Sequence, residues 1–331
     1  MPKTPLSPGK LPEALLAELL GSGAPLPQDV LVGPAVGEDA CVLAVDAGVI
    51  VAATDPITMT AAGVGGHAVL INANDVAVMG VRPRWFLCTV LLPEGTTEAD
   101  LRALFADLRR ATESLGVALV GGHTEVTPAV GRTVVVGQML GSAPSGAFVR
   151  SSGMQSGDVL LQIGPAPVEG AAVLASVAGA SIDSVPERIR ERARRALDDP
   201  GISVVEPALQ AFELGATAMH DPTEGGLSAG LWELARASGL ALEVDEQAVL
   251  WFEPGAALCR AVGADPWGTL ASGALLAAFP PERAELAFAS LASGGRGVAR
   301  LATAGPGDEV RLLGHDHPLH RYERDELSRA L

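Results

Sequence analysis

Strand-like and helix-like segments alternate along this chain, and that alternation constrains its fold more than any other feature. Residues 84–92 and 117–120 are apolar runs of strand length, and residues 99–115 between them have the spacing of an amphipathic helix. The same order returns in the second half, where a strand-like run at 159–163 precedes several helix-like segments. Alternating strands and helices favour an α/β or α+β sandwich over an all-β domain.

The predicted elements extend this pattern over both halves of the chain. In the first half we predict helices over 11–20, 65–79 and 99–115, and strands over 41–45, 49–53, 84–92, 117–120 and 133–140. In the second half we predict helices over 168–180, 186–198, 203–214, 227–237, 255–262 and 281–292, and strands over 159–163, 240–244, 274–279, 298–302 and 309–313. Turn-forming residues gather at 142–146, so we predict two domains, 1–150 and 151–331.

The charge balance argues against two classes of partner. Lys and Arg number 23 against 39 Asp and Glu, a net charge of −16, whereas nucleic acids and anionic membranes are bound through Lys and Arg. No apolar run reaches about 18 residues and no export signal is evident, so we expect neither a membrane span nor secretion. The three cysteines form no C-x-x-C pair, which favours a reducing, cytoplasmic location without disulfides.

Acidic and polar residues stand where predicted strands and helices meet glycine-rich turns. Such a residue taken alone is typical of a turn or a helix cap. Asn74 and Asp75 are harder to explain in this way, because they interrupt the apolar run of residues 69–79 and adjacent polar groups are costly to bury unless they bind something. The candidate positions are Asp39, Asp55, Asn74, Asp75, Gly121, Gly122, His123, Asp221, Gly225 and Gly226.

Several carboxylates that share one cleft without matching Lys or Arg would repel one another and raise each other's pKa. A Mg²⁺ ion removes that conflict, and it usually bridges carboxylates to phosphate oxygens. Helix N-termini and glycine amides would supply the remaining phosphate donors. The sequence therefore predicts a magnesium–nucleotide site, although the G-x-x-x-x-G-K-[ST] loop, the G-x-G-x-x-G fingerprint and the protein-kinase motifs are all absent.

Five ordered motifs resemble the aminoimidazole ribonucleotide (AIR) synthase-related superfamily, and most closely its branch of hydrogenase-maturation factors of the HypE type. The motifs are Gly37-Glu-Asp-Ala-Cys-Val-Leu, Thr54-Asp-Pro-Ile-Thr, Asn74-Asp-Val-Ala-Val-Met-Gly-Val-Arg-Pro, Gly121-Gly-His-Thr-Glu-Val and Asp221-Pro-Thr-Glu-Gly-Gly-Leu. The resemblance covers nearly the whole chain. It implies two α/β domains, a homodimer whose N-terminal sheets join in a barrel, and ATP with Mg²⁺ used to phosphorylate an oxygen of a substrate.

The same resemblance implies a role for each candidate residue. Asp39, Asp55 and Asp75 match the positions that hold metal and phosphates, with Asn74 beside them and His123 completing the site. Asp221 matches an acidic residue of the second domain that faces the same cleft, and Lys10 matches a lysine near the phosphates. The glycines whose amides we expect along the triphosphate are Gly121, Gly122, Gly225 and Gly226.

Three departures limit how much function the resemblance implies. His123 stands where many relatives carry Asp, which removes one negative charge from the site. No Cys follows Cys259, so the terminal thiol that carries the carbamoyl group in the HypE branch has no counterpart in this sequence. The reactive Cys or selenocysteine loop of selenophosphate synthetases is also missing, and Cys41 lies in a predicted strand. The acceptor is therefore left open.

Three other interpretations compete with an ATP-dependent enzyme. Residues 226–230 match the G-x-S-x-G elbow of serine hydrolases, with Ser228 as its serine, but a turn rather than a strand precedes them. The histidines His315, His317 and His320 could bind zinc if a tight loop brought them together. The chain could also bind nucleotide as a sensor or assembly subunit without turnover.

Overall fold

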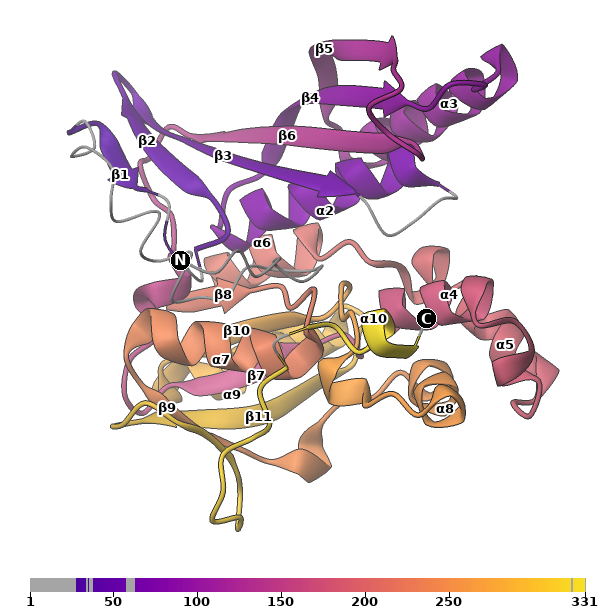
Figure 1. Ribbon diagram of the computed structural model, residues 1–331. Helices are drawn as coiled ribbons and strands as arrows, with labels where there is room; N and C mark the ends of the chain where they lie inside the picture. Colours follow the sequence, from indigo (N-terminus) through magenta and orange to yellow (C-terminus); the bar gives the residue numbers. More distant parts are fainter. Residues whose placement is uncertain (1–27, 34, 36–37, 58–62, 323, 331) are drawn as a thin grey trace, which may run out of the picture. The chain divides into compact units, whose positions relative to one another are not determined.

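The computed structural model describes residues 28–330 except residues 34, 36–37, 58–62 and 323 (Figure 1). The helix predicted over 11–20 and the candidate Lys10 lie outside this range. The described residues divide into two compact units. The N-terminal unit holds residues 28–33 and 39–148, and the C-terminal unit holds residues 149–330 together with residues 35 and 38.

The N-terminal unit is a six-stranded sheet with strand order β1-β2-β3-β6-β4-β5. All neighbouring strands are antiparallel except β4 and β5, which are parallel. The strands are β1 (Val30–Val32), β2 (Cys41–Val45), β3 (Gly48–Ile57), β4 (Pro83–Leu92), β5 (Ala118–Val126) and β6 (Val134–Ala143). The helices α2 (Val64–Val78) and α3 (Glu98–Leu115) connect β3 to β4 and β4 to β5.

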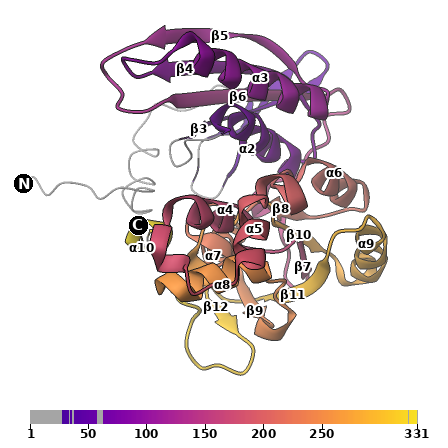
Figure 2. The ribbon, with the colours of Figure 1, turned by 90° about the vertical axis from the view of Figure 1, so that its right-hand side faces the viewer.

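Local sequence explains the ends of α3. The Thr97 hydroxyl accepts a hydrogen bond from the Asp100 amide while the Asp100 carboxylate accepts one from the Thr97 amide, which makes a capping box at the start of the helix. The helix ends at Gly116, whose φ of 66° is the left-handed conformation that favours glycine. Both α2 and α3 lie on one face of the sheet (Figure 2).

The other face of this sheet has no covering helix among the described residues of its unit. Side chains of β4 and β6 alternate between buried and half-buried, so every second residue belongs to this open face. Apolar side chains predominate there, including Leu87, Leu91, Val136 and Leu140. The edge strand β5 is exposed along nearly its whole length.

The C-terminal unit is a second six-stranded sheet, with strand order β12-β9-β11-β7-β10-β8. Its strands are β7 (Val159–Ile163), β8 (Ala218–His220), β9 (Ala241–Val244), β10 (Leu275–Phe279), β11 (Val298–Gly305) and β12 (Val310–Leu312). Its helices are α4 (Val168–Val177), α5 (Glu187–Arg194), α6 (Val205–Glu213), α7 (Gly226–Ser238), α8 (Glu253–Val262), α9 (Pro281–Ser293) and α10 (Leu327–Ala330).

Helices cover this second sheet on both sides. Leu231 and Leu234 of α7 pack with Leu160 of β7 and Leu276 of β10 in one core cluster. The helices α6 and α9 contact β10 as well, and Figure 2 shows α7 and α9 on opposite sides of the sheet. Every residue of β10 is buried as a result, as expected for a central strand covered on both faces.

Most predicted elements are confirmed, and the differences concern where they end. The strands β1 and β8 are three residues each and were not predicted. The helix predicted over 186–198 ends at Arg194, and Asp199 has a non-helical φ of −144° before Pro200. None of the described helices is long and apolar enough to cross a membrane.

Two predicted turns are wrong, because both segments continue as strands. The segment around Asp55 belongs to β3, which stays paired with β6 as far as Ile57. The segment around Gly122 belongs to β5, which stays paired with β4 as far as Val126. Continued pairing with a neighbouring strand satisfies the main chain here, whereas Gly and Pro in the sequence favoured turns.

Candidate functional site

A buried amide holds Asp55 in place in the N-terminal unit. Asn72 lies in α2 and is fully buried. Its Oδ1 accepts a hydrogen bond of 2.8 Å from the Asp55 amide, and its Nδ2 donates to the carbonyl oxygens of Asp55 at 3.2 Å and Ala68 at 2.8 Å. One side chain thereby fixes both main-chain groups of Asp55, so the position of this candidate ligand is set by α2.

The close packing around Asn72 depends on Gly137 of β6. Gly137 pairs with Asp55 across the sheet. A Cβ atom on Gly137 would lie 2.4 Å from Asn72 Nδ2 and 2.8 Å from Phe86 Cε2. Only a residue without a side chain fits between these groups, so Gly137 allows Asn72 to reach β3.

Asn74 and Asp75 lie further along the same helix. Asp75 is one turn beyond Asn72, so its side chain points toward a similar side of α2. Asn74 is fully buried and Asp75 is half-buried. Helix spacing therefore leads us to expect Asp75 near the side of α2 from which Asn72 contacts Asp55.

Gly122 lies in the same row of paired residues as Asp55 but at the far side of the sheet. The register places Asp55 opposite Gly137, Gly137 opposite Cys88 and Cys88 opposite Gly122. Three strand spacings of about 4.8 Å separate the ends of this row by about 14 Å. Gly122 also has a packing role, because a Cβ atom there would lie 2.0 Å from the Cys88 carbonyl oxygen. Gly122 thus lies well apart from Asp55, and its role along a triphosphate stays a prediction.

His123 faces the open side of the sheet. An irregularity in the β4–β5 pairing lies between Phe86 and Leu87, after which His123 pairs with Thr89. Thr89 pairs in turn with Val136, whose side chain belongs to the open face. Asp55 lies on the helix-covered face, so the structure does not bring His123 to the predicted metal ligands. The His123 ring contacts Glu125 instead, with Nε2 3.3 Å from Oε2.

Asp39 stands two residues before β2. The β2–β3 register pairs Cys41 with Ala52, and its continuation leads Asp39 toward the end of β3 that carries Asp55. Among the residues that the structure describes, no three His, Cys, Asp or Glu side chains form a group that could hold a metal ion. The three aspartates are therefore not preassembled as a cluster, and their role as magnesium ligands stays a prediction.

In the C-terminal unit, the turn between β8 and α7 carries Asp221, which is buried. Gly225 and Gly226 both have positive φ, 81° and 69°, and a Cβ atom on Gly226 would lie 2.4 Å from the Trp267 carbonyl oxygen. The preceding residue, His220, is also buried, and its Nε2 lies 2.9 Å from Glu233 Oε2. The two glycines are thus required for the turn itself.

The Gly225 and Gly226 amides both donate within the chain in this structure, and their role along a triphosphate stays a prediction. The Gly225 amide donates to Asp325 Oδ2 at 2.9 Å. The Gly226 amide donates to the Thr223 carbonyl oxygen at 3.1 Å. A buried carboxylate of the chain occupies the place at the N-terminus of α7 that we expected for a phosphate.

Asp325 is a buried acidic residue at this turn that the sequence analysis did not single out. Its Oδ1 accepts from the Leu327 amide at 2.9 Å, and its side chain is buried. Burial raises the pKa of the Asp325 carboxyl to about 7, although the two amide hydrogen bonds lower it. The nearby carboxylates of Glu224 and Glu169 raise this pKa further. No motif in the sequence distinguishes Asp325 from other acidic residues near it.

Among the described residues, neither the serine-hydrolase interpretation nor the zinc-site interpretation has the geometry that it needs. Ser228 lies inside α7, is fully buried, and donates to the main-chain carbonyl oxygen of His320 at 2.5 Å, so it is not a serine at a strand-to-helix elbow. The rings of His315 and His317 are 5.5 Å apart, while His320 packs on Tyr322. The described part of the chain holds no metal-binding group that includes them.

The two buried cysteines are poor nucleophiles. Burial raises the pKa of the Cys88 thiol, and it raises that of the Cys259 thiol to about 11. Cys259 also lies 3.5 Å from the Thr269 hydroxyl. Because the thiolate is the reactive form, neither side chain is prepared for covalent chemistry.

Comparison with known proteins agrees with this architecture. The family model described as AIR synthase related protein, N-terminal domain, matches residues 37–143, and the model for the C-terminal domain matches residues 155–315. The carbamoyl dehydratase HypE of Azotobacter vinelandii is 30% identical over 280 residues, which cover 82% of this chain and 79% of that protein.

Solved structures show the same fold. The hydrogenase maturation protein HypE in complex with ATP has a TM-score of 0.71 and 25% identity, covering 93% of this chain and 90% of that one. Thiamine monophosphate kinase from Aquifex aeolicus has a TM-score of 0.69 at 18% identity, covering 90% and 94%, and shows the fold alone. The two-domain fold and the two family matches agree over most of the chain. The protein belongs to the AIR synthase-related family.

Proposed function

We propose that this protein is an ATP- and Mg²⁺-dependent enzyme that phosphorylates an oxygen of a small acceptor. The observation that carries the proposal is the arrangement in which Asn72 of α2 fixes Asp55 of β3 while Asp75 follows one turn later. The likeness to a carbamoyl dehydratase and to a HypE structure that contains ATP supports the use of this nucleotide. One fold serves several reactions, so the site and not the fold must decide the chemistry.

The residues present fit a magnesium ion that arrives with its nucleotide. Mg²⁺ is usually held by one or two carboxylates, with water and phosphate oxygens completing its shell. Asp55 and Asp75 would supply those carboxylates, Asp39 would approach from the start of β2, and Asn74 would stand beside them. Bound Mg²⁺ would neutralise charge on the phosphate oxygens. A chain with a net charge of −16 needs that neutralisation to bind ATP.

Phosphoryl transfer of this kind depends on positioning and charge neutralisation and does not require a protein nucleophile. The buried Cys88 and Cys259 thiols agree with a reaction that needs no protein nucleophile, because their raised pKa leaves little thiolate. We therefore assign the acceptor oxygen to a separate small molecule. Asp221, which is buried in the turn before α7, would orient that acceptor.

We also propose that the protein acts as a homodimer through the open face of the N-terminal sheet. Its half-buried apolar side chains include Leu87, Val136 and Leu140, and the adjoining edge strand β5 exposes Val120 and Val126 by 53% and 58%. Apolar patches of this kind mark interaction surfaces, and bare edge strands invite pairing. A second copy of the chain would cover both, as the resemblance to the family implies.

Replacing Asp75 tests the nucleotide site directly. We expect Asp75→Asn to weaken binding of Mg²⁺–ATP by roughly tenfold or more, measured by titration calorimetry, because the amide cannot neutralise the metal. The matched control is Asp46→Asn, which removes the same charge from the exposed turn between β2 and β3. Unchanged ATP affinity in a folded Asp75→Asn protein would reject the assignment.

One observation favours a second function, nucleotide binding without turnover. The Gly225 and Gly226 amides are hydrogen-bonded within the chain, so they would not position the phosphates of a nucleotide bound by other residues for transfer. A sensor or assembly subunit would need only to hold the nucleotide. Release of ADP during incubation with Mg²⁺–ATP and candidate acceptors separates the two functions, since a pure binder releases none.

A further inference from the structure

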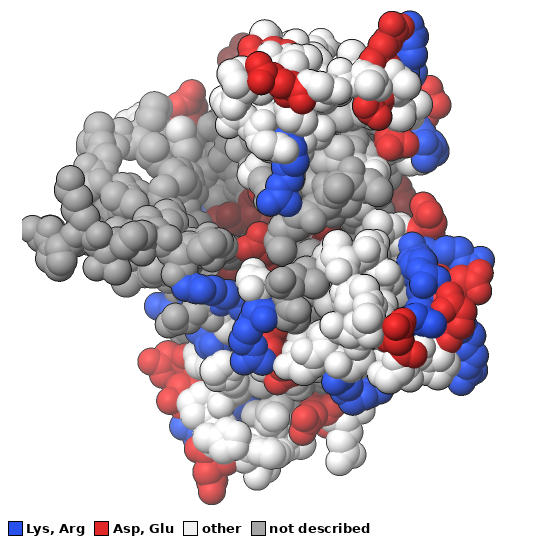
Figure 3. Space-filling model, turned by 45° about the vertical axis from the view of Figure 1, so that its right-hand side comes forward, with Lys and Arg blue, Asp and Glu red and all other residues white. Residues whose placement is uncertain are grey.

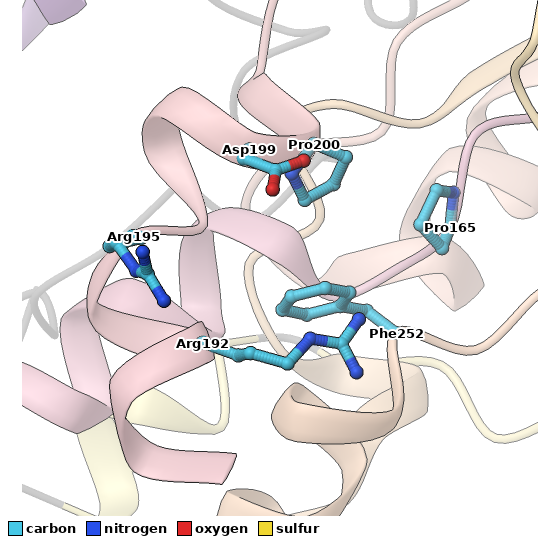
Figure 4. Close-up of a pocket in the computed structure, with 6 residues that line it drawn as sticks. All are labelled: Pro165, Arg192, Arg195, Asp199, Pro200 and Phe252. Atoms are coloured by element: carbon cyan, nitrogen blue, oxygen red, sulfur yellow. The ribbon is translucent and has the colours of Figure 1, made fainter. Parts of the chain in front are cut away.

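The C-terminal unit contains a pocket that the proposed nucleotide chemistry does not use. Its volume is about 220 Å³. The lining residues are Pro165 after β7, Arg192 and Arg195 at the end of α5, Asp199 and Pro200 in the following loop, and Phe252 at the start of α8 (Figure 4). All six belong to one unit, so the pocket is complete within it.

The two pocket arginines differ from their neighbours on α5. Arg190 and Arg194 form ion pairs at 2.7–2.9 Å with Glu187 and Asp183. The nitrogens of Arg192 and Arg195 approach carboxylate oxygens only to 3.9 Å, those of Glu253 and Glu191 respectively. Donors and acceptors at 3.9 Å do not form a hydrogen bond. Figure 3 shows that Lys or Arg and Asp or Glu side chains lie close together on one face of the molecule.

Arginine pairs of this kind recognise oxyanions. The planar guanidinium group presents donors in a fork that matches carboxylate and phosphate oxygens. Figure 4 shows the Arg195 side chain at the left of the pocket and the Arg192 guanidinium beside the Phe252 ring, with open space between the two groups. An anionic group placed between them would receive the hydrogen bonds that Glu253 and Glu191 do not accept.

The rest of the lining selects an organic ligand with a single anionic group. Phe252 is buried apart from 5% of its surface, and the Arg192 guanidinium carbon lies 5.8 Å from its ring centre. Pro165 and Pro200 add apolar surface. Asp199 also lines the pocket and would repel a second negative group on the ligand.

We propose that this pocket binds a small organic anion, with its carboxylate or phosphate group held by Arg192 and Arg195 and its apolar body against Pro165, Pro200 and the small exposed part of Phe252. The site is separate in its residues from the proposed nucleotide site, and the proposal does not depend on it. Nothing in the lining requires a covalent step, so the ligand binds reversibly.

Binding of three aromatic probes to the full chain tests this proposal. We expect benzoate and phenyl phosphate to bind in titration calorimetry or ligand-observed NMR, and benzylammonium, which has the same ring with a positive charge, not to bind. The stronger of the first two identifies the oxyanion as carboxylate or phosphate. In Arg192→Gln/Arg195→Gln we expect the affinity for both anions to fall roughly tenfold or more.

The control variant is Arg188→Gln/Arg194→Gln, which removes the same charge from the same helix without touching the pocket, and it should bind both anions as the native protein does. Circular dichroism checks that both variants are folded. Equal loss of binding in the two variants would assign the effect to net charge and overturn the proposal. Absence of binding to the native protein at millimolar probe, or binding of benzylammonium, would overturn it as well.

Discussion

Each unit of this protein uses one buried side chain to hold a main-chain segment, but the two side chains differ in kind. In the N-terminal unit the neutral amide of Asn72 holds Asp55 by its amide and its carbonyl oxygen. In the C-terminal unit the carboxylate of Asp325 holds the amides of Gly225 and Leu327. An amide can both donate and accept, whereas an ionised carboxylate only accepts.

The difference determines how each segment responds to pH. Asn72 carries no charge, so its hydrogen bonds are the same at any pH at which the protein is folded. Asp325 has a pKa raised to about 7, so its two hydrogen bonds change with protonation near neutrality. The proposed metal-binding segment is therefore held independently of pH, and the start of α7 is not.

Replacing Asn72 by an ionisable residue should have the largest effect on the free energy of unfolding. In Asn72→Asp a carboxylate would face the carbonyl oxygens of Asp55 and Ala68, to which Asn72 now donates. We expect a loss on the order of 3 kcal/mol in the free energy of unfolding at pH 8, because the buried charge keeps one donor, the Asp55 amide, and faces two carbonyl oxygens. Burial would raise the pKa of the new carboxyl, so part of the stability should return at pH 6, where protonation restores one donor.

Urea unfolding at the two pH values measures both effects. The comparison variant is Asn72→Ala, which removes the hydrogen bonds without adding a charge and should be less stable than the native protein by a similar amount at both pH values. If Asn72→Asp shows no greater pH dependence than Asn72→Ala, the Asn72 site is open to water and the contrast between the two units fails.

Adding a methyl group at Gly137, beside Asn72, should have a smaller effect on the free energy of unfolding. Gly137→Ala would place its Cβ atom 2.4 Å from Asn72 Nδ2 and 2.8 Å from Phe86 Cε2. We expect a loss of about 2 kcal/mol in the free energy of unfolding, typical of overpacked interiors, together with weaker Mg²⁺–ATP binding. Gly131→Ala is the control, because no atom lies within 4 Å of its Cβ position. Equal stability of the two variants would show that α2 and β6 can move apart freely.

Removing the charge from Asp325 should have the smallest effect on the free energy of unfolding. Because the folded-state pKa of Asp325 is raised from 3.8 to about 7, the native state binds this proton more tightly than the unfolded chain does. Its contribution to stability is present at low pH and is lost as pH rises through about 7. Between pH 6 and pH 8 the native protein should lose about 1 kcal/mol more than Asp325→Asn does.

Thermal unfolding of both proteins at the two pH values gives this difference, and subtraction removes the titration of all other groups. The Asn72→Ala protein should show the same pH dependence as the native one. Equal changes in stability for the native protein and Asp325→Asn between pH 6 and pH 8 would mean that Asp325 does not titrate in this range, and that the hydrogen bonds offset the effect of burial on its pKa.

The element pattern could be predicted from the sequence because most elements here have strong local signals. The helix α3 has a capping residue, a left-handed glycine and an amphipathic repeat, and the hairpin of β2 and β3 has a turn between two β-branched runs. The ends of β3 and β5 could not be predicted, since pairing with β6 and β4 overrides the turn propensity of Pro56 and Gly122. The short β8 lacks enough residues for a periodic signal.

The candidate site was only partly accessible from sequence. The polar interruption in residues 69–79 lies in α2, and Asn72 is part of it, three residues before Asp75. Its contact with Asp55 depends on tertiary structure and on Gly137, which no local pattern indicates. The position of His123 on the open face depends on one irregularity in the β4–β5 pairing. The hydrogen bond from Gly225 to Asp325 joins residues 100 positions apart, beyond the range of any local pattern.

The fit of Asn72 against Gly137 and Phe86 also affects how this chain could change by mutation over time. Asn72 of α2, Gly137 of β6 and Phe86 of β4 pack against one another, so a substitution at one of these positions is tolerated only after the others have changed. Random drift would rarely supply such changes in the required order. These positions should therefore remain a single inherited set among the nearest descendants of this protein, while the exposed loop at Gly131 diverges.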